Sequence, residues 1–200
     1  MLQYSFSDFY QIEAGCDEAG RGCLSGPVFA AAVILPKDLI IPGLDDSKKI
    51  SEKRRYELRE IIKHEAISWS VADVSSDEID KINILNASIK AMHLALEALK
   101  LKPELILVDG NRFKPFQSVP FYCIVKGDSK FANIAAASIL AKTYRDDFMK
   151  SISKDFPEFD WGTNKGYPTR FHMERLKELG PTVWHRKSFV CKSHQTTLPL

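Results

Sequence analysis

Three short apolar segments of this 200-residue chain each run into an acidic residue close to a glycine. They read GCDEAG at residues 15–20, ELILVDG at 104–110 and FYCIVKGD at 121–128. Short apolar runs indicate buried strands, and an acid at the end of such a strand lies at one edge of a sheet. The acids that this pattern brings to the edge are Asp17, Glu18, Asp109 and Asp128.

Two more segments have strand patterns. Residues 28–35, VFAAAVIL, form an apolar run that ends before Pro36, which indicates a buried strand. Residues 67–74, ISWSVADV, alternate Ile67, Trp69 and Val71 with small side chains. This period of two predicts a strand with one buried face.

Four segments have helical patterns. Ser51 is the expected N-cap of a helix over residues 52–63, and Pro168 and Gly180 bound another helix in PTRFHMERLKELGP. Small residues in IAAASILAK predict that a helix from about 130 to 151 packs closely against the sheet. A further helix has one face formed by Ile84, Ser88, Ala91, Met92, Ala95 and Leu99. Together, the strands and helices predict an α/β fold class with a mixed five-stranded sheet flanked by helices.

The composition favours one globular domain. Hydrophobic residues make up 44% of the chain and charged residues 27%. The longest apolar stretch is too short to span a membrane, and the N-terminus lacks the pattern of a secretory signal. The four cysteines show no C-x-x-C spacing, which argues against zinc clusters and redox pairs. We therefore expect a cytoplasmic protein with reduced thiols.

The four strand-end acids predict a metal site. In a regular strand Asp17 and Glu18 point to opposite faces, but Gly20 and Gly22 allow a bend through which the longer Glu18 reaches the same point. Converging carboxylates raise one another's pKa, and Mg²⁺ or Mn²⁺ relieves the repulsion because hard cations prefer oxygen ligands. A single acid of this kind is commonly a solvated turn residue, but the combination favours a metal. The net charge of +2 includes these acids, so the surrounding residues are basic, as binding of a polyanion requires.

Seven segments resemble, in chain order, the motifs of type 2 ribonuclease H, the ribonuclease HII family. They run from about residue 15 to 189 and read GCDEAGRGCLSGPV, DSKKIS, IDKINILNAS, LVDGN, KGDSKFANIAAASILAKTYRDD, NKGYPT and HRKSF. Type 3 enzymes have threonine in place of the central arginine of the first motif and carry an extra N-terminal domain. Arg21 and the short N-terminus therefore favour type 2.

The resemblance implies a ribonuclease H-like fold with a C-terminal helical segment. It also implies endonucleolytic cleavage of the RNA strand of RNA·DNA hybrids, and cleavage on the 5′ side of single ribonucleotides embedded in duplex DNA. The products would carry 5′-phosphate and 3′-hydroxyl ends, which suits ribonucleotide removal from DNA and primer removal. Asp17, Glu18, Asp109 and Asp128 would be the catalytic metal ligands. Two Mg²⁺ or Mn²⁺ ions about 4 Å apart would activate water and stabilise the leaving 3′ oxygen.

Cleavage at one ribonucleotide requires a sensor for its 2′-hydroxyl. Gly20-Arg21-Gly22 can bring backbone N–H and C=O groups close to that hydroxyl, because the glycines have no side chains. In the family this motif works with a tyrosine that stacks on the neighbouring deoxyribose, and Tyr167 matches it. Lys48, in DSKK, and Arg186, in HRKSF, are candidate phosphate contacts that would position the duplex.

We expect residues 1–190 to form a single catalytic domain whose part from about residue 150 is helical and contacts substrate. Residues 191–200 would be a flexible tail. Its end, Gln195 to Leu200, resembles the peptides by which bacterial proteins dock on the sliding clamp, with Leu198 and Leu200 as anchors. No heptad pattern or apolar surface helix calls for self-association, so we expect a monomer.

Two other functions would use the same residues. A DNA-junction nuclease on the same fold would cut all-DNA substrates and need no 2′-hydroxyl. A non-catalytic hybrid-binding module would keep the acids for structure alone. A comparison of substrates separates the first alternative, and Asp109→Asn tests the second, which predicts no cleavage to lose.

Overall fold

The computed structural model of the chain describes residues 2–189. One sheet of five strands lies at its centre, in the order β3-β2-β1-β4-β5. The strands are β1 (Glu13–Ala19), β2 (Val28–Ile34), β3 (Ser68–Val74), β4 (Leu105–Asp109) and β5 (Phe121–Ile124). The pairs β1–β2 and β2–β3 are antiparallel, whereas β1–β4 and β4–β5 are parallel. The predicted mixed five-stranded sheet is therefore confirmed.

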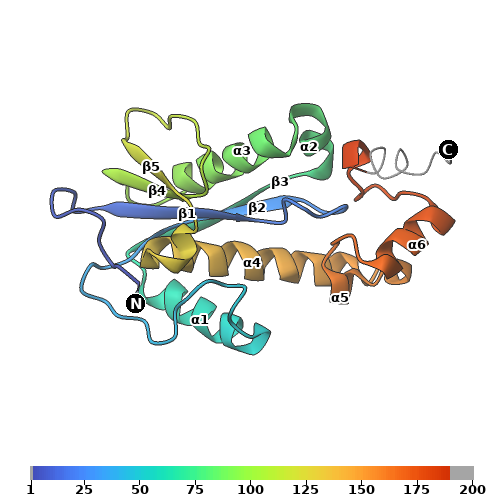
Figure 1. Cartoon of the computed structure of the whole chain (residues 1–200), viewed down its shortest axis with the longest axis horizontal. Helices are drawn as coiled ribbons and strands as arrows, with labels where there is room; N and C mark the ends of the chain where they lie inside the picture. Colours follow the sequence, from blue (N-terminus) through green and yellow to red (C-terminus); the bar gives the residue numbers. More distant parts are fainter. Residues whose placement is uncertain (1, 190–200) are drawn as a thin grey trace.

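Helices cover both faces of the sheet (Figure 1). On one face lie α2 (Ser76–Ile82) and α3 (Ile84–Glu97), and on the other lie α1 (Glu52–Glu65) and α4 (Ala132–Ile152). The remaining elements are the short 3-10 turns η1 (Gly127–Ser129) and η2 (Pro157–Phe159), and the helices α5 (Trp161–Asn164) and α6 (Arg170–Leu179). The last two helices lie beyond one end of the sheet, at the far end of α4 (Figure 1).

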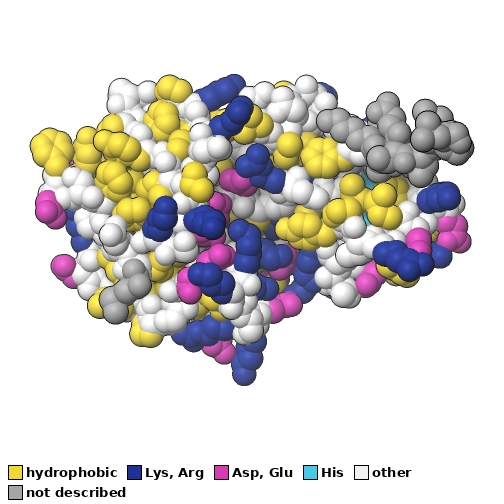
Figure 2. All heavy atoms as spheres, in the orientation of Figure 1, with side chains coloured by type: hydrophobic (Ala, Val, Ile, Leu, Met, Phe, Trp, Pro, Cys, Tyr) yellow, Lys and Arg dark blue, Asp and Glu magenta, His cyan; other side chains and the backbone are white. Residues whose placement is uncertain are grey.

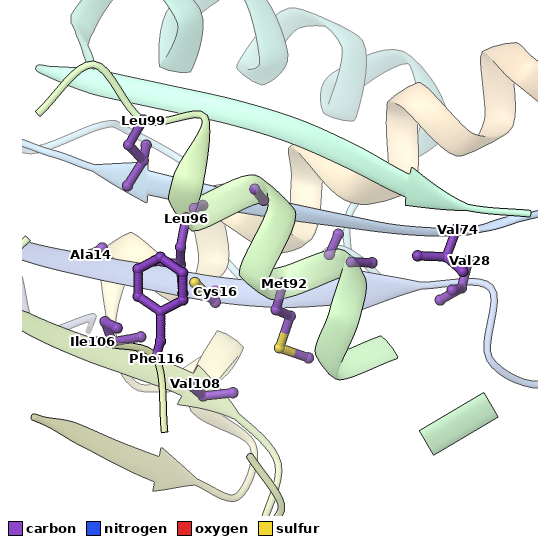
Figure 3. Packing of buried hydrophobic residues seen from close by; sticks show 14 of the residues in the cluster. Ala14, Cys16, Val28, Val74, Met92, Leu96, Leu99, Ile106, Val108 and Phe116 are labelled. Carbon is purple, nitrogen blue, oxygen red and sulfur yellow. The ribbon is translucent and has the colours of Figure 1, made fainter. Parts of the chain in front are cut away.

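The core beneath α3 explains why these strands are so apolar. Figure 3 shows Met92 and Leu96 of α3 pointing toward Cys16 of β1 and the neighbouring strands. Each strand alternates its side chains between this cluster and the α4 face. Both faces of the central strands are therefore buried, and β2 has no exposed residue along its length.

Helix α4 packs unusually closely on β1. A Cβ atom added to Gly15 would lie 2.2 Å from the carbonyl carbon of Asn133, so only glycine fits between the strand and the helix. Asn133 in turn joins two strands, because its side chain donates to Glu13 O at 3.1 Å and accepts from Leu35 N at 2.9 Å. The small residues of α4 thus permit the close packing that the sequence predicts.

Helix boundaries agree with the predicted caps. The Ser51 hydroxyl accepts a hydrogen bond from Arg54 N at the start of α1, and Gly180 ends α6 with a φ of 76°. Helix α2, which Ser75 caps immediately before α3, was not predicted. Leu99 was predicted to lie within the long helix, whereas α3 ends at Glu97.

The prediction of a single buried face for β3 is wrong. Ser68 and Ser70 are 3% and 7% exposed, whereas Ile67 lies outside the strand and is 53% exposed. The serines tolerate burial because they find partners: Ser70 Oγ donates to Ala95 O of α3, and Ser68 Oγ accepts from Lys100 N at 3.0 Å. The serine side of β3 is therefore the better buried one, and Trp69 and Val71 on the other side are only partly buried.

The segment after α4 folds back on the start of β2. Trp161 and Phe159 stack with ring centroids 5.1 Å apart in a small apolar cluster that also contains Leu24 and Met149. The division into one domain over residues 1–190, with a substrate-contacting part from about residue 150, stays a prediction. The tail at residues 191–200 lies outside the described residues. None of the described helices combines the length and apolar character needed to cross a membrane.

Candidate active site

Asp17 and Asp109 lie on neighbouring parallel strands at matching positions. Cys16 of β1 pairs with Val108 of β4, so the next residue on each strand is one of these two acids. Both side chains share the α4 face, because strand residues alternate between faces. Glu18 remains within β1, with its side chain on the α3 face. Asp128 follows β5 in η1, and Gly127 N of the same turn donates to Asp109 Oδ1 at 2.7 Å.

Two adjoining cavities bring the four acids together. The first, which we call the reading cavity, has a volume of about 240 Å³ and is lined by Asp17, Glu18, Ala19, Gly20, Arg21, Gly22, Ser47, Lys48, Asp109, Ser138, Lys142 and Tyr167. The second contains Asp128 and shares Lys48 and Asp109 with the first. Lysine and arginine side chains gather with acids across the middle of the face in Figure 2. The first cavity is thus lined by three of the acids and the second by Asp109 and Asp128, and basic residues line both cavities.

The protonation equilibria reflect this crowding. Burial raises the pKa of Asp17 well above its usual value, and the charges of Glu18 and Asp109 raise it further. Burial also raises the pKa of Glu18, against the lowering effect of Arg21. Burial raises the pKa of Asp128 as well, and the charge of Asp109 raises it further. Each ionised acid thus destabilises its neighbours, and added positive charge would relieve the cost.

The donor set suits a hard divalent cation in chemistry, because all four side chains supply carboxylate oxygens. Within residues 2–189, no three His, Cys, Asp or Glu side chains are already arranged to hold a metal ion. Two basic side chains instead approach the acids. Arg21 Nη1 lies 3.0 Å from Glu18 Oε1, and Lys48 Nζ lies 3.8 Å from Asp128 Oδ2. Metal binding would therefore require side-chain adjustment among groups that are already close.

Lys48 lies where a phosphate contact could form. Its side chain is 81% exposed, and it lines both cavities. Partial burial would lower its pKa, but attraction from Asp128 and other acids outweighs this effect and raises it. The ammonium group therefore stays charged beside the acids and accessible to a polyanion.

The glycine-rich loop, which we define as residues 20–27, forms one wall of the reading cavity. Gly20 has a φ of 96°, a conformation that side chains disfavour, and an added Cβ would lie 2.0 Å from Arg145 Nε. Arg21 and Gly22 are exposed. Tyr167 lines the same cavity, with 40% of its surface exposed. The loop and the tyrosine thus border a single opening beside the acids.

Arg186 does not lie where we expected a phosphate contact. Its side chain is 0% exposed, and its guanidinium donates to Arg21 O and Gly26 O of the glycine-rich loop. A fully buried guanidinium cannot reach a phosphate on a bound duplex. Arg186 instead supports the back of the loop, and its burial contradicts the predicted phosphate contact.

Ser138 and Ser47 were missed by the sequence analysis. Their hydroxyl oxygens lie 2.9 Å apart, both residues line the reading cavity, and a Ser138 hydrogen bond lowers the pKa of Asp17. The available signal was the single polar residue within AAASILA, at the point where the helix meets the strand ends. Cys16 and Cys23 are both buried as free thiols.

Comparison with known proteins shows that the chain is similar to ribonucleases. The model of a family described as ribonuclease HII matches residues 14–197. A ribonuclease HII from Parabacteroides distasonis is 58% identical over 188 residues, covering 94% of each chain.

Two archaeal structures are similar in fold. Ribonuclease H2 from Pyrococcus horikoshii OT3 superposes with a TM-score of 0.73 at 27% identity, over 88% of this chain and 93% of that one. In the complex of PCNA with ribonuclease HII from Archaeoglobus fulgidus, the matching chain gives a TM-score of 0.76 at 27% identity, over 94% of this chain and 96% of that one.

Proposed function

Because the chain belongs to the ribonuclease HII family, and is thus an endoribonuclease of the ribonuclease H type, we propose that it cuts duplex DNA on the 5′ side of single embedded ribonucleotides. The same site would cleave the RNA strand of RNA·DNA hybrids. The products would carry 5′-phosphate and 3′-hydroxyl ends. Such a reaction serves removal of ribonucleotides and RNA primers from DNA.

The observation that carries this proposal is that the acids and the glycine-rich loop line the same cavity. Asp17, Glu18 and Asp109 line the reading cavity together with Gly22 and Tyr167. A nucleotide bound in the cavity would therefore place its sugar near backbone groups while a neighbouring phosphate lies near the acids. The exposed main chain of Gly22 has no side chain to keep a 2′-hydroxyl away.

We propose that Asp17, Glu18, Asp109 and Asp128 hold two divalent ions, Mg²⁺ or Mn²⁺. When bound, such ions activate water and stabilise the leaving oxygen of a phosphodiester. The protein's own groups orient the substrate. Lys48 would contact a phosphate near the acids, and the Tyr167 ring would stack on a sugar.

We also propose that Gln195 to Leu200 docks on a sliding clamp. The Archaeoglobus relative, solved with PCNA, supports this idea by similarity alone, since the peptide lies outside the described residues. Deletion of residues 195–200 should abolish retention of the protein on immobilised clamp while cleavage of short duplexes is unchanged. Equal retention of full-length and shortened chains would count against the idea.

The proposed reaction is tested with three labelled duplexes: all DNA, DNA with one ribonucleotide, and an RNA·DNA hybrid. We expect cleavage in Mg²⁺ or Mn²⁺ on the 5′ side of the single ribonucleotide, and none of the all-DNA duplex. Asp17→Asn should remove this activity. Asp45→Asn, which changes a half-exposed acid outside the cavities, is the matched control and should remain active.

The alternatives give different products. Cutting of all-DNA junctions with no requirement for a ribonucleotide would indicate a junction nuclease. Binding of hybrids without cleavage by folded protein in either metal would indicate a non-catalytic module. Either result would overturn the proposed reaction.

A further inference from the structure

Arg186 is bonded to the part of the glycine-rich loop that faces the reading cavity. Its Nη1 donates to Arg21 O at 3.0 Å, while Nε and Nη2 donate to Gly26 O at 3.0 and 2.8 Å. A buried guanidinium is costly unless its donors are satisfied, and here loop carbonyls satisfy them. The two ends of the loop are thus joined through one rigid planar group.

The main chain around Arg186 is itself fixed to the loop. Arg186 N donates to Leu24 O at 2.8 Å, and Gly26 N donates to Trp184 O at 2.9 Å. These bonds accompany an antiparallel bridge between Ser25 and His185. The backbone that carries the guanidinium is therefore held in place, which limits how far the side chain could shift together with Arg21.

The bond to Arg21 O determines the direction of the next amide. The Arg21–Gly22 peptide is trans, so its N–H points opposite to its C=O. Because the carbonyl points inward to Arg186, the N–H of Gly22 points away from the protein interior. Gly22 lines the reading cavity, and no group among the described residues accepts a hydrogen bond from its N–H.

We propose that Arg186 is a positioning residue for recognition of the 2′-hydroxyl. By holding Arg21 O, it keeps the Gly22 N–H directed at the site of the ribonucleotide sugar, where it donates to the 2′ oxygen. This inference rests on the proposed function and identifies what orients its sensor. Arg145 has a different task, since it donates to Ser25 O, Pro27 O and Lys165 O.

The first test is equilibrium binding of Arg186→Lys to duplexes with one ribonucleotide or none, with Ca²⁺ replacing Mg²⁺ so that binding is followed without turnover. Lysine keeps the charge but lacks the planar fork that reaches Arg21 O and Gly26 O together. We expect the preference for the ribonucleotide to fall by about fivefold, as for loss of one hydrogen bond. Ile62→Val, a change on the buried face of α1, controls for general loss of stability and should keep the preference.

Two results would overturn the proposal in different ways. Folded Arg186→Lys with the wild-type preference would show that Arg186 does not orient the sensor, while leaving the proposed reaction intact. A wild-type protein with no preference for the ribonucleotide would instead remove the proposed reaction and, with it, this inference.

A second measurement on the wild-type protein avoids dependence on folding of the variant. The amide resonance of Gly22 should shift on addition of the ribonucleotide duplex and stay nearly unchanged with the all-DNA duplex. The Gly162 amide, which donates to Ser153 Oγ at 2.9 Å and does not line the cavity, serves as a reference. An equal shift of Gly22 with both duplexes would contradict the proposal.

Discussion

The Nε2 atoms of His172 and His185 lie 3.1 Å apart, and both rings are buried. His172 Nδ1 must donate, because its partner is the carbonyl of Tyr167 at 2.9 Å. His185 Nδ1 must accept, because Thr182 N donates to it at 2.9 Å. His185 Nε2 therefore donates to His172 Nε2, which also accepts from Trp161 Nε1. Both rings are neutral in this arrangement, and a further proton on His185 Nδ1 would displace the hydrogen bond from Thr182 N.

This pair should make stability depend on pH. Burial, and then repulsion from His172, lowers the pKa of His185 from 6.5 to about 4. Between these pH values the unfolded chain binds a proton that the folded chain excludes. The free energy of unfolding should therefore fall as pH decreases from 6.5 toward 4, by up to about 3 kcal/mol from this residue.

Denaturant unfolding across this pH range would measure the effect. The acids in the active site oppose it, since a raised pKa in the folded state favours folding at low pH, so the useful quantity is a difference between proteins. His185→Asn should show a weaker loss of stability on acidification than wild type. His64→Asn, at a side chain that is 85% exposed, should follow the wild-type curve. Parallel curves for wild type and His185→Asn would contradict the assignment.

A methyl group at Gly15 should destabilise the fold. The added Cβ of Gly15→Ala would meet backbone atoms of Asn133 and Ile134 at 2.2 to 2.5 Å, and backbone cannot rotate away as a side chain can. We expect a loss of at least about 2 kcal/mol in the free energy of unfolding. Gly22→Ala, where no atom lies within 4 Å of the added Cβ, should unfold like wild type. Equal stability of the two variants would show that α4 can move away from β1.

The grouping of acids at the ends of neighbouring strands could be predicted because its signal is local. A strand that ends on an acid beside a glycine is visible in a few residues, and strand pairing then places Asp17 and Asp109 side by side. The caps at Ser51 and Gly180 are likewise local, since each depends on a turn of the chain.

The contacts that support the glycine-rich loop could not be predicted from local sequence patterns. Arg186 bonds to Arg21 across 165 positions of sequence, and nothing near either residue indicates the contact. From sequence alone, an arginine in a basic cluster is expected to be solvated and available to bind phosphate. Only the folded structure shows that loop carbonyls surround Arg186. The buried serines of β3 were misassigned for a related reason, because their partners belong to α3 and the segment after it.

Removing one acid should stabilise the protein in the absence of divalent cations. Asp17 is 5% exposed, and ionisation of its carboxyl is costly because the group is buried and because Glu18 and Asp109 repel the charge. Asp17→Asn removes this repulsion and keeps an oxygen that can accept from Glu18 N, as Asp17 Oδ1 does at 2.7 Å. We expect a higher melting temperature than wild type at neutral pH without added metal.

The same variant tests metal binding. A cation that binds only the folded state raises the melting temperature by mass action. Saturating Mg²⁺ should therefore stabilise wild type and Asp45→Asn, whereas Asp17→Asn should show little response. A full Mg²⁺ response in Asp17→Asn would mean that Asp17 is not a ligand.

Tyr167 should contribute through its ring more than through its hydroxyl. The ring lies at the mouth of the reading cavity with the Lys142 ammonium and the Arg145 guanidinium each 5.9 Å from its centroid, so it presents a fixed aromatic surface. Tyr167→Ala should lower kcat/KM for the single-ribonucleotide duplex by about tenfold or more, the cost of one lost stacking contact. Tyr167→Phe should lose much less, and Phe9→Ala, at an aromatic residue that is 83% exposed, should match wild type. Equal losses in Tyr167→Ala and Tyr167→Phe would assign the effect to the hydroxyl and remove the stacking role.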